Sequence, residues 1–185
     1  MKDTLESAPR LRHATRSRIV LGLDPGTRIV GYGAVVAHAR GPKLFAAGVV
    51  QPGARLEVPQ RLACIQQEIE LLLEKVRPDV VVVEQAFAAR NMQSALRIGE
   101  GRGVLLACAA RFGAEIVQYP PAVAKKAAVG HGAADKTQVA AMIARSLGLQ
   151  QAPEPLDASD ALALALAWIV RQKNPLLARS ARSRK

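Results

Sequence analysis

Closely spaced cysteines and long apolar runs are both missing from this chain of 185 residues. The longest uninterrupted apolar run, residues 161–170, is far shorter than the roughly 20 residues that a membrane-spanning helix needs. The first residues show no secretory-signal pattern, so we expect a protein that is neither membrane-bound nor exported. The two cysteines, Cys64 and Cys108, lack metal-ligand spacing, and we interpret them as apolar core residues in a reducing compartment.

Acidic residues are also scarce, with 15 Asp and Glu against 26 Lys and Arg, for a formal net charge of +11. Much of the excess lies at the ends: residues 1–18 have five basic and two acidic residues, and residues 174–185 have four basic and none acidic. Half of the residues are hydrophobic, which excludes a disordered protein. We therefore predict a flexible basic arm at 1–17, one domain at 18–173 and a basic tail at 174–185.

The pattern of apolar residues predicts an α/β fold with a mixed five-stranded sheet flanked by helices. The first three strands are closely spaced, which predicts an antiparallel meander. The four valines of 80–83 predict a strand buried on both faces, as in the parallel part of a sheet. Gly31 and Gly33 would permit close packing on the second strand. We expect strands at 18–23, 29–36, 44–50, 80–83 and 114–119, helices at 57–76, 91–110, 135–147 and from 157 onward, and a loop at 127–134.

Four of the few acidic residues stand at the edges of apolar segments. Asp24 follows the run 19–23, Glu84 follows the four valines, and Asp157 and Asp160 precede the run 161–170. Each acid alone is equally compatible with a turn, a strand end or a helix cap. Together, however, Asp24 and Glu84 would end strands at the carboxyl edge of the sheet, where active sites of such folds gather. Asp157 and Asp160 would share one helix face.

A cluster of carboxylates next to apolar sequence is costly to bury without a cation. The hard ion Mg²⁺ prefers such oxygen ligands, and one or two ions can promote in-line phosphodiester hydrolysis. Because the acids would repel a phosphate backbone, the surrounding groove needs basic residues, although each of these could equally be a solvated surface charge. The candidates for DNA contact are Arg90, Arg97, Arg102, Lys125, Lys126 and Lys136.

These residues lie in an ordered series of motifs that resembles the RuvC family of bacterial Holliday junction resolvases. The resemblance extends over roughly residues 18–171. Its motifs are LGLDPGTRIVGYG at 21–33, VEQAF at 83–87, NMQSAL at 91–96, GRGV at 101–104, VGHGAADK at 129–136 and DASDALA at 157–163.

The resemblance implies an RNase H-like fold and a cytoplasmic, nucleoid-associated endonuclease that nicks two opposed strands of a four-way DNA junction. It also implies a homodimer, Mg²⁺ as cofactor with Mn²⁺ as a substitute, and the RuvA–RuvB branch-migration complex as partner. By position, Asp24, Glu84, Asp157 and Asp160 match the metal-binding acids. Phe87 matches an aromatic residue that stacks on junction bases, and Lys125 and Lys136 match basic residues near the scissile phosphate. We expect the helix 91–110, with its small residues at 99–103, to contribute to the dimer interface, packing on its own sheet being the alternative.

Three other interpretations are compatible with parts of the sequence. Actin-like ATPases and sugar kinases open with a similar phosphate hairpin, but they need about twice this length and a second phosphate loop. A DNA-binding protein without catalysis would use the acids as helix caps and turn residues. A related RNase H-like nuclease would act on RNA–DNA hybrids, and competition between junction, duplex and hybrid would identify it.

Overall fold

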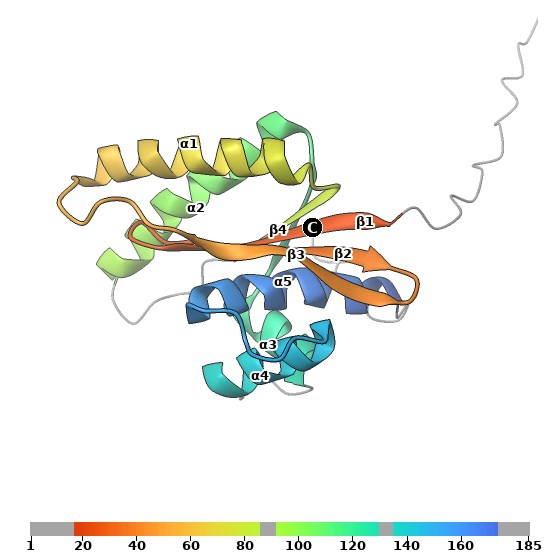
Figure 1. The fold of residues 1–185 in the computed structure, drawn as a ribbon. Coiled ribbons are helices and arrows are strands. Elements are labelled where there is room, and N and C mark those ends of the chain that lie inside the picture. Colours follow the sequence, from red (N-terminus) through yellow and green to blue (C-terminus); the bar gives the residue numbers. More distant parts are fainter. Residues whose placement is uncertain (1–16, 86–91, 130–134, 174–185) are drawn as a thin grey trace, which may run out of the picture.

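The computed structural model describes residues 17–85, 92–129 and 135–173. Its five strands form a single sheet in the order β3-β2-β1-β4-β5 (Figure 1). The strands are β1 (Arg18–Asp24), β2 (Val30–His38), β3 (Gly41–Val50), β4 (Val80–Glu84) and β5 (Glu115–Tyr119). The helices are α1 (Val58–Val76), α2 (Met92–Phe112), α3 (Pro121–Val129), α4 (Lys136–Leu147) and α5 (Leu156–Lys173).

The pairing of the strands confirms the predicted mixed sheet. β1, β2 and β3 form an antiparallel meander, and β4 lies parallel to both β1 and β5. Because β1 is in the centre, its carboxyl end lies beside the carboxyl end of β4. No helix in the described ranges is long and apolar enough to cross a bilayer.

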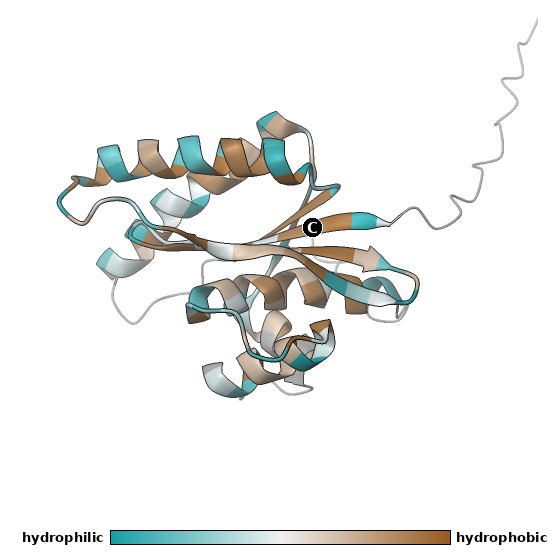
Figure 2. Ribbon diagram, in the orientation of Figure 1, coloured by the Kyte–Doolittle hydropathy of each residue, from teal (hydrophilic) through white to brown (hydrophobic). Residues whose placement is uncertain are grey.

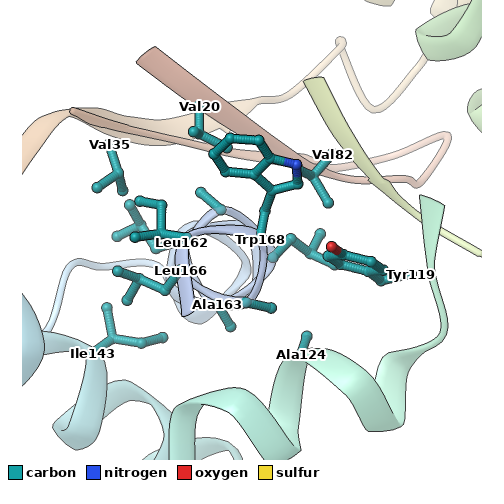
Figure 3. Close-up of a cluster of buried hydrophobic side chains, with 14 of the residues drawn as sticks. Val20, Val35, Val82, Tyr119, Ala124, Ile143, Leu162, Ala163, Leu166 and Trp168 are labelled. Carbon is teal, nitrogen blue, oxygen red and sulfur yellow. The ribbon is translucent and has the colours of Figure 1, made fainter. Parts of the chain in front are cut away.

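Helices cover both faces of the sheet (Figure 1). α1 and α2 lie on one face, and α5 lies on the other with α3 and α4 packed beyond it. The buried valines of β4 alternate between the two cores, as the run of four valines predicted: Val81 and Val83 pack toward α1 and α2, and Val80 and Val82 pack toward α5. Figure 3 shows the second core, with side chains of α5 directed both at the sheet and at α3 and α4.

Two of the covering helices, α1 and α5, differ in how much of their surface is buried. α1 presents one apolar side to the sheet through Ile65, Ile69 and Leu73, and its other side is mostly polar, apart from the exposed Leu71 (Figure 2). α5 is buried at every position of 158–169 except Asp160, because it lies between the sheet and the α3–α4 layer. It therefore reads as an almost continuous apolar run in the sequence.

Glycines let α5 approach the sheet closely. A Cβ atom at Gly33 would lie 2.6 Å from Leu162 Cγ, and one at Gly22 would lie 3.0 Å from the Ala161 carbonyl carbon. Gly31 is crowded in the same way by Asp157. The expected role of Gly31 and Gly33 in close packing is thus confirmed, and Gly22 of β1 shares it.

The prediction of a loop at 127–134 was wrong for residues 127–129, which are helical. Residues 121–129 form α3, whereas residues 130–134 lie outside the described part of the chain. Pro121 is the first residue of α3, where proline needs no backbone N–H partner and already has a helical φ. The alanines that follow favour a helix, so Pro120-Pro121 ends β5 and begins α3 at once.

Candidate active site

Asp24 and Glu84 stand side by side at the carboxyl edge of the sheet. Each is the last residue of its strand, and the preceding residues Leu23 and Val83 are paired in the parallel ladder. Side chains alternate along a strand, so both acids share the face of Val82, which packs toward α5. The strand pairing and the two-residue period together direct both carboxylates toward the same helix.

A cavity of about 290 Å³ opens at this edge. Asp24, Glu84 and Asp160 line it together with apolar residues of the three helices on this side, namely Pro121, Ala124, Val139 and Ala163. Asp157 is not among the lining residues, but it lies one turn before Asp160 in α5 and contributes to the electrostatics of Asp24. The structure therefore gathers three of the four acids around one cavity and places the fourth at its border.

The pKa of Asp24 shows that burial and the neighbouring acids both disfavour its charged form. Burial raises the pKa of Asp24 from 3.8 to about 8, with further upward contributions from Glu84, Asp160 and Asp157. The Glu84 carboxyl lies within hydrogen-bonding reach of Asp24, and this contact also raises the pKa of Asp24. Each of these causes disfavours a negative charge on Asp24.

The donor chemistry of the cavity suits a hard divalent cation. The polar side chains that line it are all carboxyls, the oxygen ligands that Mg²⁺ prefers. Within the described ranges, no three His, Cys, Asp or Glu side chains are already arranged to hold an ion. Holding an ion would therefore require the acidic side chains of the cavity to change their orientation.

Three larger hollows lie away from this cluster, and the smallest of them, of about 310 Å³, has no acidic lining residue. One of about 660 Å³ lies between α4 and the segment before α5, and one of about 400 Å³ lies between the β2–β3 strands and α1. Each is lined by only one acidic residue, Glu154 and Glu68 respectively. Size alone would favour these hollows, but only the smaller cavity combines acids from separate strands and a helix.

The candidate DNA-contact residues fall in several places. Arg97 is paired on the surface of α2 with Glu100, 3.0 Å away. Lys126 is an exposed residue of α3, two positions after the cavity-lining Ala124. The backbone puts Lys125 one residue after the cavity-lining Ala124 and Lys136 at the first position of α4. Phe87 and Arg90 lie outside the described residues.

Arg102 has partners within the protein. Its Nε donates a hydrogen bond to the backbone carbonyl of Glu84 at 3.2 Å, and its Nη2 donates to Oε1 of Gln118. Sequence reasoning identified Arg102 only as a possible phosphate contact and did not identify Gln118 at all. Neither interaction has a local sequence signal, because α2, β4 and β5 meet only in the folded chain.

The order of the mixed sheet, the helix packed against its central strands and the acids at the carboxyl edge define the class of RNase H-like nucleases. A yeast mitochondrial Holliday junction resolvase, Ydc2, shares the fold with a TM-score of 0.62 at 15% identity over 87% of this chain and 83% of that one. At this level of identity the likeness extends to the fold alone.

Closer relatives specify the family. The family model of crossover junction endodeoxyribonuclease RuvC matches residues 20–168. The enzyme of that description from Syntrophomonas wolfei is 44% identical over 147 residues, which are 80% of this chain and 86% of the relative. The structure of Thermus thermophilus RuvC has a TM-score of 0.76 at 32% identity, covering 84% of this chain and 95% of that one. The structure of the same protein in complex with a Holliday junction substrate has a TM-score of 0.75 at 35% identity, covering 81% of this chain and 92% of that one.

The chain belongs to the RuvC family of crossover junction endodeoxyribonucleases. This confirms the fold and the function that the sequence motifs implied, a nuclease that resolves Holliday junctions. The family also replaces the three other interpretations, since none of them is a junction endonuclease.

Proposed function

We propose that Asp24, Glu84, Asp157 and Asp160 are the catalytic acids and that they hold one or two Mg²⁺ ions, for which Mn²⁺ substitutes. The observation that carries this proposal is the convergence of Asp24, Glu84 and Asp160 on one cavity, with a pKa of Asp24 raised to about 8. When bound, the cation supplies charge neutralisation and an activated water for in-line attack on phosphorus.

The residues around the cavity have separate roles in this proposal. Asp24 and Glu84 would hold the cation from the ends of two paired strands, and Asp160 would add a ligand from α5, which packs on those strands. Lys126, together with Lys125 on α3 and Lys136 at the first position of α4, would compensate the repulsion between the acids and the DNA backbone. Arg90 and Arg97 extend this basic surface, and Phe87 stacks on bases at the junction centre.

Resolution of a junction requires two matched cuts, so we propose a homodimer with a two-fold axis and one active site in each protomer. The outward side of α2 supports this proposal. Met92 and Leu96 are 80% and 64% exposed, and Gly99 and Gly103, further along the helix, have open space beside them. Such a surface of apolar and small residues would allow two copies of α2 to approach each other closely.

The basic arm and tail join the domain at the far end of the sheet from the acids. Arg18, where the arm joins β1, and Lys173, where the tail leaves α5, line one hollow of about 310 Å³. We propose that residues 1–17 and 174–185 contact DNA arms outside the cleavage centre through charge alone. In keeping with a DNA substrate, we place the enzyme at the nucleoid in the bacterial cytoplasm, together with the RuvA–RuvB complex.

A synthetic immobile four-way junction tests the proposal. The purified protein should cut two opposed strands of the junction in Mg²⁺ or Mn²⁺ and none in EDTA. In Ca²⁺ it should bind the junction without efficient hydrolysis, because a larger ion with looser geometry misplaces the attacking water. Linear duplex and RNA–DNA hybrid serve as matched competitors. Full turnover in EDTA, or equal competition by the hybrid, would contradict the proposal.

A further inference from the structure

Arg102 joins the carboxyl ends of two neighbouring strands. It projects from α2 and donates from Nε to the carbonyl oxygen of Glu84, the last residue of β4. Its Nη2 donates to Oε1 of Gln118 on β5. Beyond Glu84 the ladder continues with one more bond, from the amide of Gln85 to the carbonyl of Tyr119 at 2.8 Å. The guanidinium therefore bridges the two strands where their pairing ends.

The bridge lies on the opposite face of the sheet from the acid cavity. Gln118 is paired with Val83, which packs in the core beneath α1 and α2. The Glu84 side chain points to the other face, into the cavity beside α3 and α5. Arg102 thus contacts the backbone of Glu84 from the face of the sheet that α1 and α2 cover. The strand β4 separates the guanidinium from the carboxyl groups of the cavity.

Gly101, the residue before Arg102 in α2, packs against the turn that follows Asp24. Gly101 is buried against the turn after β1, and a Cβ atom there would lie 2.5 Å from the carbonyl oxygen of Gly26. Two consecutive residues of α2 therefore lie against Gly26, two residues after Asp24, and against the backbone of Glu84. A displacement of this helical turn would change the distance between the two carboxyls.

We propose that Arg102 is a positioning residue for junction cleavage, which holds the Glu84 backbone so that its carboxylate stays in register with Asp24. This role replaces the phosphate contact expected from its charge. The inference rests on the proposed catalytic role of Glu84. Arg102 acts through its two hydrogen bonds and touches neither the DNA nor the reacting atoms.

Variants of both ends of the bridge test the proposal. Arg102→Ala removes both bonds, and Arg102→Lys keeps the charge but cannot reach both acceptors. Gln118→Ala removes one acceptor without touching a basic residue, and Gln118→Glu restores an acceptor. Arg111→Ala is the matched control, because Arg111 lies on the same helix and pairs only on the surface with Glu70. Glu84→Gln is the reference for the proposed function.

The readouts are kcat on a saturating junction, junction Kd without divalent ions, the dependence of that Kd on salt, and hydrogen exchange of the Gln85 amide. Arg102→Ala and Gln118→Ala should lower kcat by about 10-fold to 100-fold, as is usual for groups that orient ligating side chains. Their Kd and salt slope should stay at wild-type values, and the Gln85 amide should exchange faster. Gln118→Glu should have a kcat close to that of the wild type. Arg102→Lys should have a kcat as low as that of Arg102→Ala, although the lysine keeps the positive charge.

A phosphate contact would give the opposite pattern. Arg102→Ala would then weaken binding and reduce the salt slope by about one, Arg102→Lys would restore binding, and Gln118→Ala would have no effect. That result, or an unchanged kcat in both alanine variants, would overturn the proposal. If Arg102→Ala fails to fold, the two Gln118 variants decide alone. An active Glu84→Gln enzyme would refute the proposed catalytic acids, whereas its inactivity beside an active Arg102→Ala enzyme would refute only the positioning role.

Discussion

Gly31 lies directly beneath Asp157: a Cβ atom at position 31 would come within 2.6 Å of the Asp157 carbonyl carbon. Gly31 is also the partner of Asp24 in the β1–β2 ladder. One glycine therefore sets the distance at which the first turn of α5 passes over the strand end that carries Asp24. Because Gly31 has no side chain, α5 can bring Asp157 close to Asp24.

Replacing this glycine should affect both stability and activity. In Gly31→Ala the new methyl group meets backbone atoms of α5, which cannot rotate away, so we expect about 1–3 kcal/mol of destabilisation. Cleavage should fall further than stability explains, because Asp157 and Asp160 move away from Asp24. Gly53→Ala is the control, since its nearest neighbour is a side-chain atom 3.6 Å away. Urea unfolding and kcat on a junction measure the two effects, and equal behaviour of the two variants would contradict the prediction.

Asp24→Asn should separate catalysis from binding. The variant keeps the shape of the side chain but loses a charged metal ligand, so several kcal/mol of transition-state stabilisation disappear and kcat should fall by about 10³-fold or more. Junction affinity should stay equal or rise, because a charge that repels the phosphate backbone is gone. Anisotropy and gel cleavage assays measure both. Glu115→Gln is the control, because Glu115 begins β5 at the edge of the sheet opposite the acids, and it should change neither kcat nor junction affinity. A folded Asp24→Asn protein that no longer binds the junction would contradict the assignment.

The raised pKa of Asp24 predicts a pH dependence of stability in EDTA. The folded protein keeps this proton up to about pH 8, whereas an ordinary aspartate releases it near 3.8. The stability that the proton contributes is therefore complete at low pH and is lost as the pH rises through this window. The free energy of unfolding should decline by at most about 1.4 kcal/mol per pH unit. Asp24→Asn should have a flatter profile in urea unfolding, and parallel profiles would exclude the shift.

Two glycines of α2 should respond in opposite ways to the same substitution. Gly101→Ala places a methyl group against the Gly26 carbonyl and should destabilise the protein by about 1–3 kcal/mol. Gly103→Ala meets no atom within 4 Å and should stabilise the protein by about 0.5–1 kcal/mol through better helix propensity. Unfolding would be measured at a dilution where sedimentation shows only monomer. Stabilisation by both substitutions would show that the contact between α2 and the β1–β2 turn is loose.

Mixed dimers test the proposed pairing of active sites. A dimer with one wild-type and one Asp24→Asn subunit has a single competent cavity, so it should nick one strand and leave a nicked junction. Differently tagged subunits allow its isolation, and denaturing gels with label on each strand count the cuts. Paired cuts by the mixed dimer, or full activity of a proven monomer, would refute the two-site arrangement.

The sequence by itself determined the local pieces of this protein. Four consecutive valines predicted a strand buried on both faces, and the turn-forming or polar residues after Asp24 and Glu84 favoured a strand end at each acid. The motifs around these acids were also sufficient to identify the family. Such features depend on neighbours along the chain, so periodicity and motif order reveal them.

Only the tertiary structure decided which distant residues meet. That Arg102 contacts the Glu84 backbone rather than the solvent, that Gly101 packs on the turn after Asp24, and that α3 helps to line the acid cavity all follow from packing between elements far apart in sequence. A basic residue on a helix has the same local signature whether it faces DNA or the end of a strand. Its role is set by long-range packing, which no local pattern specifies.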